Sequence, residues 1–328
     1  MSILKPMARH LVGLMLAAAT VLAHAAPEEV TYLLPAPPVL PAFAPWMIAQ
    51  QNGYYADENI KVTFVAGKGG VDVAKQIGAG NAIIGGAIGD TPIIVRANGI
   101  PVKAVAVLGA GSLMQLAVHD DGPIRKVADL KGKTLSVMAY TDTTYYALLG
   151  TLKQAKLGKD DVSAQAAGPT GVWQLFAAKK SEAMAAVPDW IVSAEDAGAK
   201  VRILPGGDAF PSMAQAILAS DDAIRNKPDL IKRLVRATLR GMQDIIRDPK
   251  AAVAVYVKAV PSFQGKEASL ERVFKLYRDG VYANQKVLGH IDATRLATVQ
   301  KFYVGEGIVP RAVPVAELFT NQFVGVAH

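Results

Sequence analysis

The residue types that most often carry out enzyme chemistry are scarce in this sequence. It contains no cysteine and five histidines among 328 residues. A chain without cysteine forms no disulfide, zinc–thiolate site or iron–sulfur cluster, and it has no cysteine nucleophile. His119, His290 and His328 do not have the spacing of a His-x-x-x-His metal pair. The sequence therefore predicts neither a metal site nor a cofactor.

Three short stretches match catalytic or nucleotide-binding motifs only in part. Gly132-Lys133-Thr134 ends like a phosphate-binding loop, but Val127 stands where that loop requires glycine. Gly67-Lys68-Gly69 is followed by Asp72 where a dinucleotide-binding fingerprint has its third glycine. Ser112 does not lie in a Gly-x-Ser-x-Gly sequence, the nucleophile motif of α/β-hydrolases. We therefore expect a protein that is not an enzyme.

Polar and aromatic side chains follow the ends of several expected strands, where helices begin. In open α/β sheets, ligands bind beyond the carboxyl ends of the strands, where the N–H groups of helix N-termini converge. Aromatic walls with a few polar groups are typical of small-molecule pockets. The candidate ligand-binding residues are Phe43, Trp46, Asp90, Thr91, Ser112, Tyr140, Asp142, Thr143, Thr144, Asp189 and Trp190.

These candidates also have structural interpretations. Asp90 and Asp142 are placed to cap helices, and Asp189 suits the first turn of a helix. Trp46 and Trp190 can equally belong to the core. The sequence alone leaves both interpretations open.

The elements that must position these residues alternate between strands and helices. This alternation predicts two α/β lobes with parallel sheets and right-handed crossovers. The expected strands cover residues 30–34, 61–65, 82–88, 102–108, 134–138, 183–187 and 201–204, and the expected helices cover residues 45–52, 71–77, 91–98, 143–157, 169–180 and 189–197. The proline-rich residues 35–45 predict a loop. Beyond Pro211 the pattern is mostly helical, with helix starts at Pro228-Asp229 and Asp248-Pro249.

The first 25 residues have the pattern of a cleavable signal peptide. Lys5 and Arg9 precede an uncharged run over residues 11–23, and Ala23-His24-Ala25 has small residues at the positions that signal peptidase reads. The run is too short to span a bilayer as a helix. We expect cleavage after Ala25 and, because no cysteine follows, no lipid anchor.

The net charge of the chain is dispersed. It is formally +7 and falls to +5 when the two basic residues of the predicted leader are removed. Lys232, Arg233, Arg236 and Arg240 share one face of an expected helix, which we interpret as a solvated face, with a functional basic patch as the alternative. Nucleic acid is therefore not an expected partner.

Three stretches of the chain, in this order, resemble the binding proteins of ABC importers for nitrate, sulfonates, taurine and thiamine precursors. The first combines PWMIAQQNGYY (residues 45–55) with ENIKV (residues 58–62), the second is DLKGKT (residues 129–134), and the third is TTYYAL (residues 143–148). In this family an apolar helix runs into a Gly-Tyr-Phe sequence, acidic residues and a strand. The resemblance covers nearly the whole chain after the leader.

This resemblance implies an α/β periplasmic binding protein of type II, with two Rossmann-like lobes, two crossover strands and a ligand cleft between the lobes. The crossovers would be residues 113–118 and 214–218. The first lobe would comprise residues 26–115 and 214–328, and the second lobe residues 116–213. The implied protein is a monomer in the periplasm that captures a small-molecule solute by closure and delivers it to permease and ATPase subunits.

The sequence departs from this family at Thr141-Asp142, where small residues such as Gly-Ser are usual. An additional carboxylate near the ligand repels anions in a cleft of low dielectric constant, and Lys68 is the one obvious cation of the candidate loops. Both observations argue against nitrate. They leave an organic sulfonate or carboxylate, or a neutral or cationic nitrogen heterocycle stacked between aromatic rings. A pyrimidine-precursor synthase of related fold and a periplasmic sensor subunit are the alternatives to transport.

Overall fold

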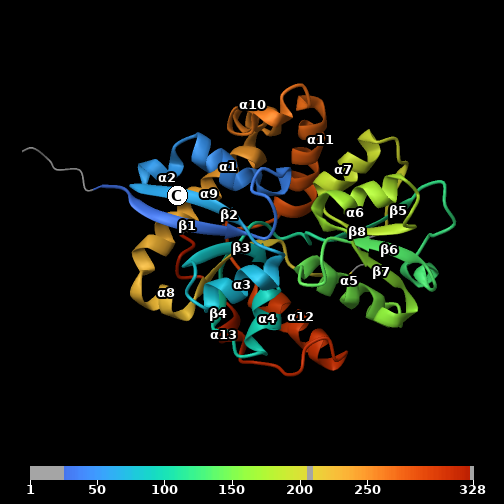
Figure 1. The fold of residues 1–328 in the computed structure, drawn as a ribbon. Helices are drawn as coiled ribbons and strands as arrows, with labels where there is room; N and C mark the ends of the chain where they lie inside the picture. The colour runs from blue at the N-terminus through green and yellow to red at the C-terminus, as the bar shows by residue number, and fades with distance from the viewer. Residues whose placement is uncertain (1–25, 205–209, 326–328) are drawn as a thin grey trace, which may run out of the picture.

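Two five-stranded sheets form the centres of two lobes (Figure 1). The computed structural model describes residues 26–204 and 210–325, so the predicted signal peptide lies outside the described residues. The sheet of the first lobe has the order β2 (Ile60–Ala66), β1 (Glu28–Leu34), β3 (Ile84–Ile88), β10 (Gln215–Ser220) and β4 (Val102–Val107). The sheet of the second lobe has the order β7 (Ser163–Ala166), β6 (Thr134–Val137), β8 (Ala183–Ala186), β5 (Gln115–His119) and β9 (Val201–Ile203).

Both sheets are mixed. The expectation of parallel sheets was wrong for one strand in each lobe, which runs antiparallel to its neighbours. In the first sheet, β1 runs parallel to β2 and β3, but β10 runs antiparallel to β3 and β4. In the second sheet, β6 runs parallel to β7 and β8, but β5 runs antiparallel to β8 and β9. The chain reaches β5 and β10 directly from the other lobe. These strands therefore lack the crossover helix that makes neighbouring strands parallel.

Helices surround both sheets. The first lobe carries α1 (Ala44–Gln51), α2 (Tyr54–Asp57), α3 (Gly70–Gly78), α4 (Thr91–Arg96), α8 (Asp221–Asn226), α9 (Pro228–Arg247), α10 (Pro249–Ala259), α11 (Glu267–Tyr277), α12 (Ala293–Gly305) and α13 (Val315–Leu318). The second lobe carries α5 (Thr143–Gln154), α6 (Gly168–Ala177) and α7 (Pro188–Asp196). Short turns are η1 (Pro41–Phe43), η2 (Val127–Leu130), η3 (Lys159–Asp161), η4 (Pro261–Phe263) and the π-helical η5 (Arg278–Tyr282). No helix within residues 26–204 or 210–325 is long and apolar enough to cross a membrane.

Local sequence accounts for many of these boundaries. The predicted helix starts at Pro228 and Pro249 are confirmed, and Asp248 caps α10 by accepting a hydrogen bond from the N–H of Ala251 at 3.0 Å. All five residues of β3 are buried, as expected for an apolar strand that is covered on both faces. β7 was not predicted, because its sequence SAQA is mostly exposed and has no apolar pattern.

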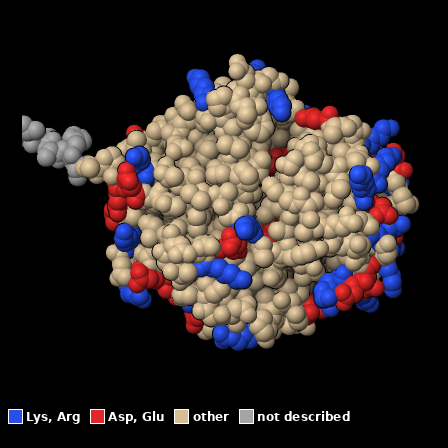
Figure 2. Space-filling model, viewed as in Figure 1, with Lys and Arg blue, Asp and Glu red and all other residues tan. Residues whose placement is uncertain are grey.

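Acidic residues of the first lobe neutralise most of the basic face of α9. The ion pairs are Arg233–Glu28, Arg236–Glu58 and Arg240–Asp57. Figure 2 shows the charged side chains of one face in small mixed groups, most of them around the edge of the view and one near its middle. The structure therefore favours the solvated-face interpretation of this cluster over a basic patch.

One apolar core continues from the first lobe into the second. Tyr32 and Trp46 of the first lobe belong to the same buried cluster as Met138, Phe176 and Trp190 of the second lobe. A separate cluster fills the space on the other side of the second sheet. The two lobes are thus in apolar contact with each other, and the structure represents a closed arrangement.

Arg295, near the start of α12, joins both segments by which the chain passes between the lobes. Its Nε donates a hydrogen bond to the carbonyl oxygen of Pro211 at 3.2 Å, and its Nη2 donates to the carbonyl oxygen of Ser212. Its Nη1 donates to the carbonyl oxygen of Ala110, and Nη2 also lies 3.2 Å from the hydroxyl of Ser112. One side chain therefore fixes the separation of the two connections.

We expect Arg295→Ala to lower the free energy of unfolding by about 2–4 kcal/mol, because it leaves three carbonyl oxygens without their charged donor. Arg272→Ala is the control. Arg272 also joins the lobes, through Glu195 and Asp196 of α7, but it is half exposed, and its loss should cost less than about 1 kcal/mol. Urea unfolding measures both variants. Equal losses would show that Arg295 does not hold the connections together.

Candidate functional site

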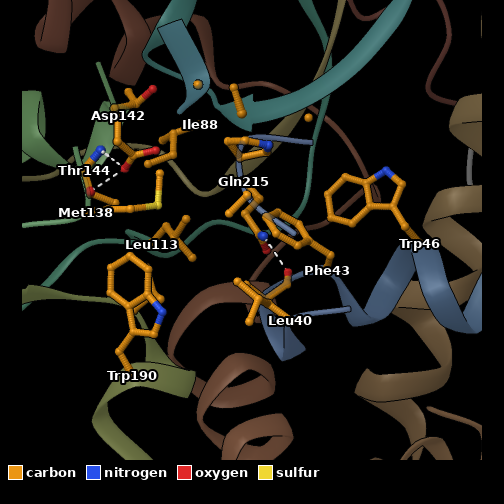
Figure 3. Close-up of a pocket in the computed structure, with 18 residues that line it drawn as sticks. Leu40, Phe43, Trp46, Ile88, Leu113, Met138, Asp142, Thr144, Trp190 and Gln215 are labelled. Carbon is orange, nitrogen blue, oxygen red and sulfur yellow. Dashed lines mark hydrogen bonds between the residues drawn. The ribbon is translucent and has the colours of Figure 1, made fainter. Parts of the chain in front are cut away.

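A cavity lies between the two lobes (Figure 3). The chain that follows β1 and the end of β3 enclose it from the first lobe, and the N-terminal turns of α5 and α7 enclose it from the second. Its open volume is about 40 Å³, which is room for one or two water molecules. Pockets for small organic ligands usually measure several hundred Å³. The lobes must therefore part before such a ligand can enter.

Aromatic side chains from both lobes line this cavity. Phe43 of η1 and Trp46 of α1 come from the first lobe, with ring centroids 6.0 Å apart in an edge-to-face arrangement. Trp46 is fully buried and also packs edge-on against Tyr32 at 6.2 Å. Trp190 of α7 faces the cavity from the second lobe, on the side away from Trp46 (Figure 3). Rings on two sides favour a planar aromatic ligand between them.

The indole of Trp190 brings an unused hydrogen-bond donor to the cavity wall. Pro188 is the first residue of α7, so Trp190 lies in the first turn, where the helix enters the cleft. The side chain of Trp190 is 5% exposed, and its Nε1 is buried without a hydrogen-bond partner. A buried donor without a partner costs about 1–3 kcal/mol. A ligand with an acceptor atom at this position would remove that cost.

Asp142 is the one ionisable side chain among the described residues that line the cavity. It caps α5, since its Oδ1 accepts hydrogen bonds from the backbone N–H of Thr144 at 3.0 Å and from the Thr144 hydroxyl. Burial raises the pKa of Asp142. The hydrogen bonds from Thr144 and the N–H groups of Gly70 and Thr143 offset part of this rise. Asp142 thus both caps α5 and lines the cavity.

The loops that precede α3 and α5 meet beside the cavity, backbone against backbone. The Thr141 hydroxyl donates to the carbonyl oxygen of Lys68 at 2.6 Å, and the N–H of Val71 donates to the carbonyl oxygen of Thr141 at 3.1 Å. Gly69 has a φ of +97°, and a Cβ at this position would lie 2.8 Å from the Thr141 carbonyl oxygen. We call this contact the clasp. It requires glycine, because a side chain would separate the lobes.

Gln215 lines the cavity and was not among the sequence candidates. It is the first residue of β10, is 3% exposed, and donates from Nε2 to the carbonyl oxygen of Ala42 at 2.6 Å. The Tyr282 hydroxyl lies 3.5 Å from its Oε1. A buried amide at the start of the otherwise apolar strand QAILAS was the signal that could have identified it.

The structure gathers six of the eleven candidates around the cavity and places five elsewhere. The six are Phe43, Trp46, Asp142, Thr143, Thr144 and Trp190, and the five are Asp90, Thr91, Ser112, Tyr140 and Asp189. That any of them binds a ligand stays a prediction.

Asp90 and Thr91 support the cavity from outside. Asp90 precedes α4 but makes no side-chain capping bond. Its carboxylate instead accepts from the N–H of Met213 at 2.6 Å and from the Tyr303 hydroxyl at 3.1 Å. The Thr91 hydroxyl lies 2.8 Å from the hydroxyl of Thr143. This buried pair links the two lobes directly.

Ser112 and Tyr140 also have structural partners. The Ser112 hydroxyl donates to the carbonyl oxygen of Ser212 at 2.7 Å and so joins the two interlobe connections. Tyr140 is 52% exposed, and its hydroxyl donates to the carbonyl oxygen of Ala164 at 2.9 Å. Both side chains are outside the cavity wall.

The lining of the cavity is mostly apolar. Among its described residues there is no Lys, Arg or His. In the part of the chain that the structure describes, no group of three or more His, Cys, Asp and Glu residues could hold a metal ion. The arrangement can therefore provide apolar contact, ring stacking, the indole donors of Trp46 and Trp190, hydroxyl groups and one carboxylate.

Comparison with known proteins gives a family and a fold. The family model described as NMT1/THI5 like matches residues 40–252. The riboflavin-binding protein RibY of Chloroflexus aurantiacus is 27% identical over 289 residues, which are 86% of this chain and 82% of that protein. The 4-amino-5-hydroxymethyl-2-methylpyrimidine phosphate synthase of Uromyces fabae is 23% identical over 305 residues, covering 87% and 84%.

A solved structure with the same fold is the alkanesulfonate-binding protein SsuA from Xanthomonas axonopodis pv. citri bound to MOPS. Its TM-score is 0.72 at 19% identity, over 91% of this chain and 100% of that chain. The type II periplasmic binding protein fold is thereby confirmed.

Asp189 should make the free energy of unfolding depend on pH, because its carboxyl group is buried at the contact between α7 and α11. Its Oδ1 accepts a hydrogen bond from the Tyr277 hydroxyl at 2.9 Å, and burial raises its pKa from 3.8 to about 6. A raised pKa means that the folded state binds the proton more tightly. The contribution of Asp189 to the free energy of unfolding should therefore fall by up to about 3 kcal/mol as the pH rises from about 4 to about 6.

We expect Asp189→Asn to reduce this pH dependence, since asparagine still accepts from Tyr277 but does not ionise. Asp90, whose pKa is also raised to about 6 by burial, should leave a residual slope. Urea unfolding at pH 4, 5, 6 and 7 measures the effect. The control is Asp222→Asn, on the exposed face of α8, which should behave as the wild type. An unchanged slope in Asp189→Asn would contradict the assignment.

Proposed function

This chain belongs to the NMT1/THI5-like family, and we propose that it is the solute-binding component of an ABC importer that captures an uncharged, planar heterocycle. The observation that carries the proposal is the cavity wall, which combines aromatic rings from both lobes with one carboxylate and, among its described residues, no basic side chain. An uncharged ring system gains from stacking and burial and needs no counter-ion.

The electrostatics of the cleft argue against a sulfonate or carboxylate as the preferred ligand. An anion beside Asp142 meets a like charge where the dielectric constant is low. Among the described residues of its wall, the cavity also has no Arg or Lys side chain of the kind that usually binds such a group. The relative RibY is named as a riboflavin-binding protein, and riboflavin carries a heteroaromatic ring. That similarity supports the heterocycle class for this chain.

We further propose that the protein works in the periplasm after cleavage of its signal peptide, as a monomer that delivers its solute to permease and ATPase subunits. The lobes, divided near residues 115 and 214, would open for capture and close around the solute. A sensor subunit with the same cleft would instead be encoded beside a kinase or cyclase gene, whereas an importer subunit would be encoded beside genes for a permease and an ATPase.

A binding role fits this cleft better than the synthase activity of the relative from Uromyces fabae. The chain has no cysteine, and no histidine is found among the described residues of the cavity wall. Ionisable nucleophiles and acid–base groups other than Asp142 are thus missing there. Product formation by the purified protein, without permease or ATPase, would establish the enzyme alternative instead.

The proposal is tested by thermal unfolding of the mature protein with added solutes. Riboflavin and 4-amino-5-hydroxymethyl-2-methylpyrimidine represent heterocycles, and ethanesulfonate and nitrate represent anions. A solute at 100 times its Kd should stabilise the native state by about 2.7 kcal/mol and raise the Tm accordingly. We expect a heterocycle to raise the Tm and the anions to leave it unchanged. The opposite pattern would refute the proposal.

Trp190→Phe tests the contribution of the indole donor. This change keeps an aromatic ring but removes the Nε1–H group, so the Kd of the heterocycle should rise about threefold to tenfold, as expected for one hydrogen bond. Isothermal titration measures the Kd. Trp173→Phe is the matched control, because Trp173 of α6 is half-buried in another groove, which is lined mainly by α7 and α11. Equal effects of both changes would assign Trp190 to the core alone.

A further inference from the structure

The N-termini of two helices face one point at the edge of the cavity. α3 of the first lobe begins at Gly70, and α5 of the second lobe begins at Thr143. A Cβ at Gly70 would lie 2.6 Å from the Thr143 hydroxyl oxygen, so the first turns are in contact. Helix N-termini attract anions, because their N–H groups have no partners within the helix and the helix dipole is positive there.

The carboxylate of Asp142 occupies this point. Its Oδ1 accepts from the N–H of Thr144 at 3.0 Å and from the hydroxyl of Thr144. The N–H groups of Gly70 and Thr143 also face the carboxylate. Asp142 is only 6% exposed, so its carboxylate is largely shielded from bulk water. The N–H and the hydroxyl of Thr144, which would bind an external anion, are therefore already used by a side chain of the protein.

The clasp fixes this carboxylate in place. Thr141 precedes Asp142 and is bonded to Lys68 at 2.6 Å and to Val71 at 3.1 Å, which are both residues of the first lobe. The N–H of Asp142 itself lies 2.9 Å from the position that a Cβ of Gly69 would take. The clasp therefore holds the backbone next to Asp142 against the first lobe, beside the N-terminus of α3.

The free donors that remain in the cavity wall are of a different kind. The Nε1–H groups of Trp190 and Trp46 are both buried, have no partner and carry no formal charge. A neutral donor suits a carbonyl or ring-nitrogen acceptor and gives an anion little compensation for lost water. The cavity wall therefore suits a ligand with an uncharged acceptor atom.

We propose that Asp142 is the specificity-determining residue of this cleft, acting as an internal anion that fills the site between two helix N-termini and so excludes sulfonates and carboxylates. This inference rests on the proposed function in one respect, namely that the cleft is the ligand site. Removal of the carboxylate should make the cleft accept an anion, because the N–H groups of both helices become free.

The test compares the binding of ethanesulfonate and of riboflavin to the wild type, Asp142→Ser and Asp142→Gly. Serine and glycine are both tolerated at helix N-caps, so α5 should still form. We expect at least a tenfold gain in affinity for ethanesulfonate in Asp142→Gly, and a gain in the same direction for Asp142→Ser, whose hydroxyl retains one of the bonds. Circular dichroism melting verifies that each variant is folded.

Asp248→Ser is the matched control. Asp248 also caps a helix, by accepting from the N–H of Ala251 at 3.0 Å, but it is outside the cavity. We expect this variant to bind ethanesulfonate no better than the wild type. A folded Asp142→Gly protein without a gain for ethanesulfonate would overturn the proposal, as would an equal gain in Asp248→Ser.

Measuring both ethanesulfonate and riboflavin separates this inference from the proposed function. If the wild type binds no heterocycle but Asp142→Gly gains ethanesulfonate, the heterocycle assignment fails and the role of Asp142 stands. If the wild type binds riboflavin and Asp142→Gly gains no ethanesulfonate, the role of Asp142 fails. Tight binding of ethanesulfonate to the wild type itself overturns both.

Discussion

The hydrogen bonds of one guanidinium group determine how the two lobes can be arranged. The chain passes between the lobes twice, and Arg295 binds carbonyl oxygens of both passages. Since the passages lead directly into β5 and β10, a fixed separation between them sets the relation of the two sheets. The cavity, the contact between α7 and α11 and the clasp all lie between lobes that this side chain holds in register.

Within that frame, the cleft derives its chemical character from helix N-termini rather than from basic side chains. α5 and α7 both direct their first turns to the cavity, and each contributes one decisive group, Asp142 and Trp190 respectively. One group is an acceptor that already binds the N–H of Thr144, and the other is a donor without a partner. With the proposed role of Asp142, such a cleft would select uncharged ligands although the fold offers positive helix ends.

Much of the fold was predictable, because strand and helix alternation and helix caps are local signals. The starts of α9 and α10 follow from their prolines, and the burial of β3 follows from its apolar run. The antiparallel direction of β5 and β10 depends on the path between lobes, which no local pattern encodes. The lining of the cavity was predictable in part. Asp142, Trp190, Asp90 and Asp189 all follow strand ends. Asp142 and Trp190 line the cavity, but Asp90 and Asp189 instead accept hydrogen bonds from tyrosines that are distant in the sequence. Gln215 lies at the cavity because the chain returns from the second lobe to the first just before it, and no local pattern encodes that course.

The clasp has a consequence for how such a protein can diversify. It is formed by backbone atoms and one hydroxyl, around Gly69 and Thr141, and none of these groups belongs to the cavity wall. Side chains such as Phe43, Trp190 and Gln215 can therefore be exchanged without altering the contact that holds the lobes shut. Under the proposed importer role, the closed surface that the permease would contact is separable from the residues that contact the ligand, so substitutions in the wall would change the ligand and keep the same permease.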